Sequence, residues 1–456
     1  MRRITHATLL AAALGLAPVS GFGQTLEEGL TVYDRGDYQI ALEHFRPLAE
    51  QGHPDAQFHL GLMYNSGQGV AKDDQESMAW YRRAAEQGHA GAQYRLGIWY
   101  FAGGQDFDRD LTESEAWFRR AAEQGHSKAM LLLGRLVEDR QEGMAWYHRA
   151  AEQGDAVAQH RLGQIYRNGT DVPQNYQEAA AWFRRSAEQG HIPGKTNLAR
   201  MYLDGQGVPQ NDQEAAVWYR RAAEQGDFGA QEKVGRMYKN GQGVVQNDQE
   251  AVAWFRLAAE QGNAQGKLNL GNMYAKGKGV PQNYQEAAAW YRRAAEKGHP
   301  DAQFNLGVMY KNGQGVVQDD QEAVAWLRRA AGQRHAVKQG HADAQFYLGA
   351  MYKSGQGVPQ NYKEAAAWFR SAAMQGHADA QSSLGNMYSE GLGVHPNPVI
   401  AYMLEILAAA QGNEIARQNR DISLQSLSRE QVNEGQRLAS EWRVGSGFPV
   451  IVRTWP

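Results

Sequence analysis

The chain of 456 residues contains no cysteine, and it has no apolar run near the roughly 18 residues that a membrane-spanning helix requires. Disulfide bonds and lipid anchors on cysteine are therefore excluded, and no transmembrane segment is expected in the mature chain. Neither charge sign dominates, because 47 Lys and Arg stand against 50 Asp and Glu, for a net charge of −3. The chain has no overall basic field that would gather nucleic acid, so nucleic acid is not an expected partner.

The amino-terminal segment has the features of a secretory signal. Arg2 and Arg3 precede an apolar stretch at residues 7–17, and the small residues Gly21 and Gly23 stand two positions apart, as signal peptidases require. The apolar stretch is too short for a permanent membrane helix. We therefore interpret residues 1–23 as a signal peptide and expect a mature protein that is periplasmic or secreted.

A glycine that ends the motif Glu-Gln-Gly, or a close variant of it, recurs along most of the chain, usually 36 residues after the previous one. The recurring glycines are Gly52, Gly88, Gly125, Gly154, Gly190, Gly226, Gly262, Gly298, Gly340, Gly376 and Gly412. Such a period is typical of a solenoid, in which each unit buries its apolar face against its neighbours. The sequence predicts an all-α fold, an α/α superhelical solenoid of about eleven helix-turn-helix repeats with a C-terminal helical cap.

The unit at residues 301–331 shows how the first helix of a repeat, helix A, is encoded. Ala302, Leu306 and Met309 have the spacing of one helix face. Gly307 lies within this helix, where glycine is less favourable than alanine. We therefore expect another backbone to approach helix A closely at Gly307.

A loop and a second helix, helix B, complete each unit. Gly313 and Gly315 punctuate the chain after helix A, and Asp319 begins a capping motif for helix B. In another unit, Trp218 and Tyr219 fall within the apolar sector of helix B, while the neighbouring arginines point elsewhere. The sequence predicts that this aromatic pair is the core of the repeat.

These features resemble the Sel-1-like repeat family, a relative of the tetratricopeptide repeats. The residues that carry the resemblance in one unit are Ala302, Gln303, Leu306, Gly307, Met309, Tyr310, Gly313, Gly315, Val316, Trp326, Arg329 and Ala330. The resemblance covers residues 54–412, and residues 24–53 resemble a shorter first unit of the tetratricopeptide type. It implies an α/α superhelix used for protein binding and complex assembly, often in the bacterial envelope.

The pattern departs from this family in a few places. The unit at residues 125–154 lacks the Gly-x-Gly-Val loop, and six extra residues lie near positions 334–339. After Gly412 the repeat signature ends. Ser428 and Gln431 form a predicted capping box, so we assign residues 413–456 to C-terminal capping helices and a tail.

The units can be compared with one another to separate scaffold positions from variable ones. Counting from the helix A glycine, positions −5, −1, +2 and +3 are nearly constant, whereas −3, +1 and +4 vary and lie on the opposite side of the helix. We expect the variable positions to line a concave groove. The candidate partner-binding residues are Phe58, Leu62, Tyr94, Ile98, Phe304, Val308 and Phe346 at −3 and +1, and Arg167, Lys239, Lys311 and Lys353 at +4.

The candidate positions form two apolar patches on either side of a polar middle, which includes the −3 residues His160 and Glu232. Our hypothesis is an exported, non-enzymatic adaptor whose groove binds other proteins or peptide segments of the envelope. A second hypothesis is a recognition module for an envelope polysaccharide or peptidoglycan fragment, which a groove rich in exposed Trp would favour. Incidental exposure or partial burial of the same residues is the remaining interpretation.

Histidine recurs just after the glycine that ends the unit. The positions are His53, His89, His126, His191, His299, His341 and His377. Stacked repeats would hold these side chains about 10 Å apart, too far to share one metal ion. We therefore predict a role in the turn or at the start of helix A.

Other patterns that could carry chemistry are weak. Asp106, Asp108 and Asp110 alternate as in a calcium loop, but Leu111 and Trp117 stand where such a loop needs Gly and Glu, so a solvated acidic loop is favoured and calcium stays an open alternative. No serine-hydrolase, zinc-protease or phosphate-loop motif is present. Paired arginines of helix B predict a solvated face. We expect no enzyme activity, no cofactor and no metal.

Overall fold

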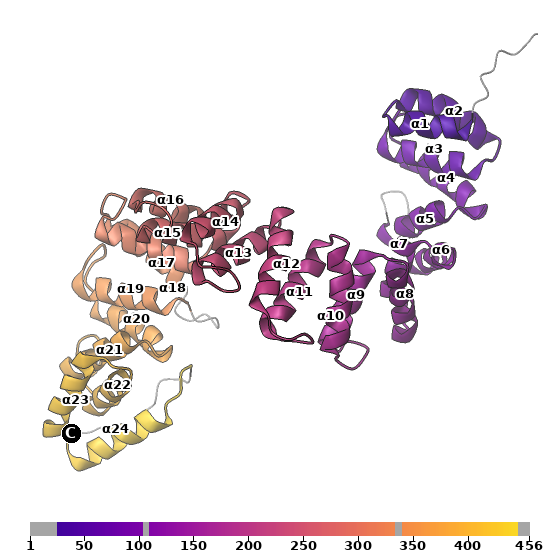
Figure 1. Ribbon diagram of the computed structural model, residues 1–456. Helices are drawn as coiled ribbons and strands as arrows, with labels where there is room; N and C mark the ends of the chain where they lie inside the picture. The colour runs from indigo at the N-terminus through magenta and orange to yellow at the C-terminus, as the bar shows by residue number, and fades with distance from the viewer. Residues whose placement is uncertain (1–24, 104–108, 333–339, 446–456) are drawn as a thin grey trace, which may run out of the picture. The chain divides into compact units, whose positions relative to one another are not determined.

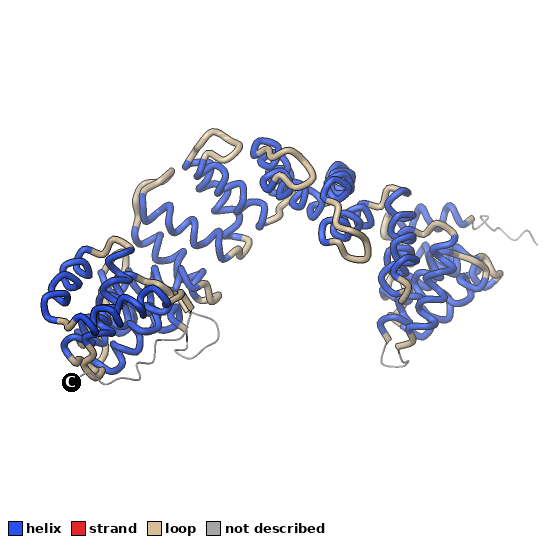
Figure 2. The backbone as a smooth tube through the Cα atoms, turned by 90° about the horizontal axis from the view of Figure 1, so that it is seen from below, coloured by secondary structure: helices blue, strands red, loops and turns tan. Residues whose placement is uncertain are grey.

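The computed structural model describes residues 25–103, 109–332 and 340–445, and these residues form 24 α-helices without any strand (Figures 1 and 2). The predicted all-α fold is confirmed. The predicted signal peptide at residues 1–23, the pair Asp106 and Asp108, the extra residues 334–339 and the tail after residue 445 lie outside the described residues. None of the helices described is long and apolar enough to cross a membrane.

The chain divides into two compact units, residues 1–209 and 210–456. The helices of the first unit are α1 (Leu26–Asp34), α2 (Tyr38–Glu50), α3 (Pro54–Ser66), α4 (Asp74–Glu86), α5 (Ala90–Ala102), α6 (Leu111–Glu123), α7 (Ser127–Leu136), α8 (Arg140–Glu152), α9 (Ala156–Asn168), α10 (Tyr176–Glu188) and α11 (Ile192–Asp204). Odd-numbered helices are A helices and even-numbered helices are B helices, so α7 and α8 form the fourth repeat.

The second unit begins with helix B of the sixth repeat. Its helices are α12 (Asp212–Glu224), α13 (Phe228–Asn240), α14 (Asp248–Glu260), α15 (Ala264–Lys276), α16 (Tyr284–Ala295), α17 (Pro300–Asn312), α18 (Asp320–Ala331), α19 (Ala342–Ser354), α20 (Tyr362–Met374), α21 (Ala378–Glu390), α22 (Pro398–Ala410), α23 (Glu414–Ser426) and α24 (Arg429–Glu441). The eleventh repeat is formed by α21 and α22, and α23 and α24 follow it.

Within each of the two units, the core lies between the helices of a repeat and the next helix A. In the ninth and tenth repeats, α17 packs against α18, and α18 packs against α19. Leu327 of α18, Leu348 of α19 and Trp368 of α20 belong to one buried cluster. The helix B residues Trp218 and Tyr219 are also buried. The aromatic pair is therefore part of the core, as predicted, and each cluster extends across a repeat boundary.

In most repeats the helix A glycine makes room for an aromatic ring of helix B. A Cβ atom at Gly349 would lie 2.6 Å from Cδ1 of Phe369, and one at Gly97 would lie 2.5 Å from the ring of Phe118. Real Cβ atoms do not come this close to another atom. The predicted close approach is confirmed, but the nearest group is a side chain: at Gly307 it is Cγ of Leu327, 2.8 Å from the Cβ position, with the backbone carbonyl oxygen of Ala323 at 3.2 Å.

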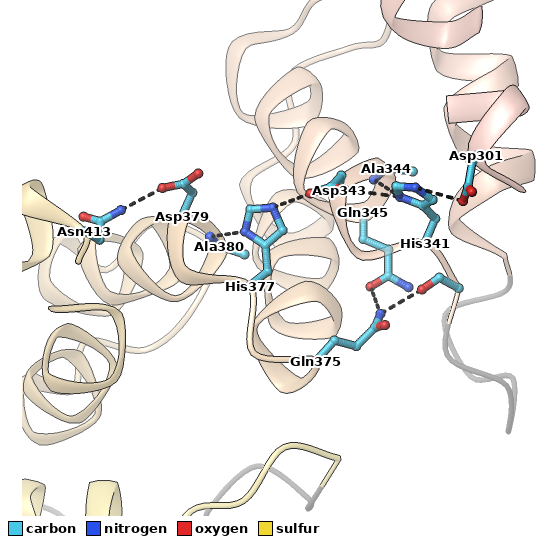
Figure 3. A network of polar contacts seen from close by, with 11 residues as sticks. Asp301, His341, Asp343, Ala344, Gln345, Gln375, His377, Asp379, Ala380 and Asn413 are labelled. Atoms are coloured by element: carbon cyan, nitrogen blue, oxygen red, sulfur yellow. Dashed lines mark hydrogen bonds and ion pairs between the residues drawn. The ribbon is translucent and has the colours of Figure 1, made fainter. Parts of the chain in front are cut away.

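Glutamine side chains link successive repeats (Figure 3). Nε2 of Gln345 donates to the carbonyl oxygen of Ala331, 3.2 Å away, at the end of the preceding helix B. Its amide oxygen accepts from Nε2 of Gln375 at 2.9 Å. The pairs Gln57–Gln87 and Gln381–Gln411 repeat the second contact. The last carbonyls of a helix have no intrahelical partner. The buried glutamine amides donate hydrogen bonds to these carbonyls, which are shielded from water.

The paired arginines of helix B are exposed, as predicted, and each makes a specific contact. Arg293 lies over the ring of Trp290 in its own helix, with Cζ 4.5 Å from the ring centroid. Its neighbour Arg292 donates to the hydroxyl of Tyr310 in the next helix A. The equivalent bond from Arg256 to the Tyr274 hydroxyl is 2.8 Å long. The predicted solvated face is thus also a set of contacts between repeats.

The Gly-x-Gly-Val loop lies on the first turn of the preceding helix B. Gly315 has φ +69°, and a Cβ atom there would lie 2.1 Å from the carbonyl oxygen of Tyr284, the first residue of α16. The same approach recurs at Gly207, Gly243, Gly279, Gly357 and Gly393. Only glycine combines this positive φ with so close a contact.

The fourth and fifth repeats depart from this arrangement. Only residues 137–139 join α7 to α8, so the fourth repeat has no Gly-x-Gly-Val loop. In the fifth repeat, Asp171 stands where the other loops have the second glycine. Its φ is +68°, and it is the one non-glycine residue with positive φ in the described parts of the chain.

The last repeat is closed by α24, which packs on α22. Ser428 and Gln431 form the predicted capping box at the start of α24. Leu438 of α24 is buried in the cluster of the last repeats. In α22, Glu405 occupies the position of the helix B ring, and it is only 2% exposed. The predicted helical cap is confirmed.

Candidate functional site

The predicted partner-binding residues lie on the A helices at the surface that we call the A-face, defined by positions −3, +1 and +4. The −3 and +1 residues are Phe58 and Leu62 on α3, Tyr94 and Ile98 on α5, Phe304 and Val308 on α17, and Phe346 on α19. All seven are half-buried. Each helix A also contacts the neighbouring repeat, and this contact covers part of the side chains that the helix wheel places opposite the core.

Aromatic residues at position −3 stack on the histidine that begins the next helix A. The ring centroids of Phe346 and His377 are 4.8 Å apart with an interplanar angle of 22°. The equivalent stacked pairs are Phe58–His89, Tyr94–His126 and Phe304–His341. One side of each aromatic ring therefore serves the junction between repeats, which the sequence comparison did not reveal.

The stacked histidines cap helix A, and this confirms their predicted place at the helix start. Nδ1 of His377 accepts the amide hydrogen of Ala380 at 3.2 Å, and Nε2 lies 3.1 Å from Oδ1 of Asp343 in the preceding repeat (Figure 3). The capping bond requires an unprotonated Nδ1, so the hydrogen of the neutral ring lies on Nε2 and points toward the carboxylate. Burial lowers the pKa of the equivalent His89 and favours this neutral form.

The same pairing continues in both directions from His377. Nε2 of His341 lies 3.5 Å from Oδ1 of Asp301. After the last histidine, Asn413 caps α23 and donates to Oδ1 of Asp379 at 2.7 Å. Within each unit, the aromatic −3 residues are thus held in a defined geometry by these caps, stacks and carboxylate contacts.

The second unit carries a contiguous aromatic patch on the A-face. The ring of Tyr347 on α19 stands edge-on to Phe304, with centroids 5.6 Å apart, and to Phe346, with centroids 5.8 Å apart. Nζ of Lys311 lies 6.0 Å from the Tyr347 centroid. Tyr347 is at position −2 and was not among the predicted site residues. In the sequence, the only indication of its role was that this aromatic residue follows Phe346 in a repeat that comes directly after the one with Phe304.

In the first unit, the two A-face rings are arranged differently. Phe58 and Leu62 pack against the cluster that contains Tyr81 and Trp117. Tyr94 and Ile98 pack against the next cluster, around Phe118. The first-unit residues therefore form two adjacent apolar sites that belong to different cores.

The polar middle of the A-face includes a hydrogen-bonded chain in the fifth and sixth repeats. Nδ2 of Asn197 lies 3.0 Å from Nε2 of His160, and its Oδ1 accepts from Nη1 of Arg167 at 2.6 Å. Burial, with nearby positive groups, lowers the pKa of His160 to about 4. Arg167, one of the predicted basic +4 residues, is therefore engaged within the A-face itself.

In the second unit, the polar −3 residue Glu232 is buried and accepts from Nδ2 of Asn269 in the next repeat at 3.1 Å. Nζ of Lys233 lies 3.6 Å from its other carboxylate oxygen. The remaining predicted basic residues, Lys239 and Lys353, are half-buried at the +4 positions of α13 and α19. Lys353 and Lys311 bring positive charge to the repeats that carry the aromatic patch.

Two of the hollows among the described residues adjoin B helices. A cavity of about 340 Å³ lies where α7, α8 and α9 meet, and its lining includes Arg135, Arg140, Arg161 and Asp171. A second, larger and more apolar hollow of about 810 Å³ lies between α12 and the loop after α13, beside Val217 and Val245. Val245 is 89% exposed. Sequence reasoning found neither hollow, although the aspartate in a glycine position marks the first.

The described residues contain no group of three or more His, Asp or Glu side chains that could hold a metal ion. Asp110, the described member of the possible calcium loop, caps α6 by accepting from the amides of Thr112 and Glu113. Every Trp side chain in the described ranges is buried or half-buried. These rings are therefore poorly placed for stacking on sugars.

The fold and the A-face together define a class of protein, the α/α solenoids built from short helical hairpins. Eleven stretches of the chain match the Sel1 repeat, at residues 11–53, 54–89, 90–126, 128–155, 156–191, 193–227, 229–263, 264–299, 300–335, 342–377 and 378–413. These stretches cover most of the sequence, so the chain belongs to the Sel1 repeat family. Sel1 repeat proteins serve as protein-interaction scaffolds, and the fold is typically non-catalytic.

Two solved structures support this assignment. One is c5321, a protective antigen present in uropathogenic Escherichia coli strains that displays an SLR fold; it is 35% identical, with a TM-score of 0.76, over 91% of this chain and 90% of that chain. The other is a Sel1 repeat protein from Oxalobacter formigenes, 37% identical with a TM-score of 0.57, over 68% of this chain and 91% of that chain. No curated protein matches the chain.

Proposed function

We propose that the protein is an exported, non-catalytic adaptor that binds envelope or secreted proteins on the A-face. The observation that carries this proposal is the patch formed by Phe304, Tyr347 and Phe346 beside Lys311. Half-exposed aromatic rings next to a lysine ammonium group are suited to extended protein segments with apolar and acidic side chains. The first unit offers a second apolar surface around Phe58 and Tyr94.

Polysaccharide recognition is the less favoured alternative. Sugar binding usually relies on exposed aromatic faces, and the Trp rings described above are buried or half-buried. The A-face rings also use one side for stacking on histidine. The available surface therefore favours a protein segment over a stacked sugar.

A double substitution, Val308→Glu with Ala350→Glu, tests the proposal. Both +1 side chains border the aromatic patch, so the new carboxylates place charge on the patch without removing the stacked rings. We expect crosslinking in the periplasm, followed by mass spectrometry, to recover the partners of the natural chain in at least tenfold lower amount. Leu257→Glu on α14 is the matched control, because Leu257 is 45% exposed, lies on a helix B and borders neither hollow.

Unchanged recovery with the double variant, in a protein that keeps its helical content and melting temperature, would show that the A-face patch does not bind partners. Export is tested separately. We expect the mature protein in the periplasmic or secreted fraction, with an amino terminus close to residue 24. A full-length cytoplasmic protein would contradict export.

A further inference from the structure

The cavity between the fourth and fifth repeats has a structural cause. In the regular repeats, the second glycine of the loop lies so close to the preceding helix B that a Cβ atom would be 1.9–2.2 Å from a carbonyl oxygen, as at Gly243 and Gly315. Asp171 has a Cβ atom at this position. The loop therefore cannot rest on the first turn of α8 in the regular way. The carboxylate of Asp171 instead pairs with Arg140, the first residue of α8, at 2.5 Å.

The short fourth repeat removes a second piece of the regular packing. Because only residues 137–139 connect α7 and α8, the loop of the fifth repeat has no equivalent loop beside it. The space that remains is the cavity of about 340 Å³. Two independent departures from the repeat thus meet at one place, and both lie within the first unit.

The lining of the cavity has an apolar part and a part rich in hydrogen-bond donors. Hydrogen-bond donors are concentrated there, since Arg135 and Arg161 contribute guanidinium groups and Gln164 and Asn168 contribute amides. The apolar part of the lining includes Met144 and Ile165. Arg161 also lies 5.9 Å from the ring centroid of Tyr147, which places its charge next to an apolar wall.

The acidic residues of the lining limit the charge of a ligand. Asp171 is paired with Arg140, and Glu138 remains on the short connection between α7 and α8. A doubly charged phosphate would be repelled by these carboxylates, whereas a single carboxylate with a neighbouring N–H group can use the guanidinium groups and Glu138 together. A peptide ending in an apolar residue has this combination, because its α-carboxylate, last amide and side chain are adjacent.

We propose that this cavity binds the carboxyl-terminal residue of a partner protein, with its α-carboxylate on Arg135 and Arg161 and an aliphatic side chain against Met144 and Ile165. The inference rests on the proposed role in protein binding and adds a defined subsite to it. Arg135 and Gln164 are +1 residues of α7 and α9, so the cavity lies at the edge of the A-face. A partner segment on the first-unit A-face can end in it.

The test measures fluorescence anisotropy of the full chain with the labelled peptide Gly-Ser-Gly-Ser-Ala-Leu, made with a free carboxylate and with a carboxamide. We expect the free acid to bind at least tenfold more tightly. Arg161→Gln is expected to abolish this difference. Asp171→Gly restores the glycine of the regular loops, so we expect the loop to move onto α8, fill the cavity and weaken binding of the free acid at least tenfold.

Equal binding of acid and amide, or undiminished binding by both variants, would overturn the proposal. Binding of free leucine, measured by calorimetry, without measurable binding of the peptide would also overturn it, because the site would then be an amino-acid site. The double variant Val308→Glu with Ala350→Glu is the control, since it alters the second unit only. We expect it to bind the peptide normally, so failure of the second-unit patch and failure of this subsite give different results.

Discussion

At the junction between the tenth and eleventh repeats, the stack, the helix cap and the loop contact follow the repeat pattern, whereas the junction between the fourth and fifth repeats keeps the helices but loses the loop. In the first case Phe346 stacks on His377, and Gly393 lies on the first turn of α20. In the second case Asp171 pairs with Arg140, and a cavity remains beside them. The comparison shows that helix packing maintains the solenoid, while the loops are free to diverge and create a site.

The largest expected change in stability comes from substituting the helix A glycine of a regular repeat. Gly349→Ala places a Cβ atom 2.6 Å from the Phe369 ring, whereas Gly385→Ala in the last repeat meets only ordinary contacts, the nearest at 3.4 Å, because Glu405 replaces the ring. We expect Gly349→Ala to lower the free energy of unfolding by about 2–3 kcal/mol. We expect Gly385→Ala to raise it by up to about 1 kcal/mol.

Urea denaturation followed by circular dichroism measures both variants. The natural protein gives the reference slope, since partial unfolding of single repeats would change that slope. Equal destabilisation by the two substitutions would contradict the assignment of the glycine to ring packing.

The next effect concerns the histidine of the regular junction. His377→Ala removes a helix cap and an aromatic stack, and we expect a loss of about 2 kcal/mol in the free energy of unfolding. His377→Asn retains a capping side chain, as Asn413 does naturally in the next position, so we expect about half of that loss. If asparagine and alanine are equally destabilising in thermal melts, the cap does not contribute.

A third prediction uses pH to distinguish two titratable groups, His160 of the first unit and Glu405 of the second. The folded-state pKa of His160 is about 4, below its ordinary value of 6.5, so its contribution is fully present above pH 6.5 and is lost as the pH falls toward 4. We expect a loss of about 1 kcal/mol over this range, since the ring is only partly buried. Glu405 has the opposite sign, because burial raises its pKa and its contribution is lost as the pH rises through the folded-state value.

Melting temperatures measured from pH 4 to 8 test this difference in sign. His160→Gln should flatten the acid side of the profile, and Glu405→Gln should leave that side unchanged while raising the melting temperature near neutral pH. A His160→Gln protein that keeps the full acid sensitivity would show that other groups cause it.

The smallest effect is expected at the irregular junction. Asp171→Gly relieves a positive φ at a non-glycine residue and removes an ion pair whose arginine side chain is 77% exposed. The first change is favourable by about 1 kcal/mol, and the second costs little because surface pairs are weak. We expect a net gain of less than 1 kcal/mol, measured by urea denaturation. A clear loss would mean that the Asp171–Arg140 pair holds the loop in place.

Much of the scaffold could be predicted because the same local sequence signals recur in successive repeats. The glycine punctuation, the helix B aromatic residues and the capping box at Ser428 are local signals, and each is found where the sequence places it. The character of the contact at the helix A glycine could not be predicted. Helical spacing shows that the glycine needs space, but not whether a ring or a backbone occupies it.

The candidate site was predictable in position but not in detail. The −3 residues do lie on the A helices, yet half of each ring serves the junction, and the stacking of Phe346 on His377 joins residues of different repeats. The role of Tyr347 and the cavity beside Asp171 also depend on contacts between repeats. A helix wheel describes one helix and contains no information about the rotation of the next one.

The sequence by itself determined the number, length and order of the helical hairpins, because caps, breakers and the 3.6-residue period act within a few residues of one another. It also determined the membership of the chain in a repeat class. Only the tertiary structure decided which side chains remain available, since adjacent repeats cover one side of the A-face rings and leave the space beside Asp171 open. Burial between repeats is a property of packed surfaces, and no single repeat contains it.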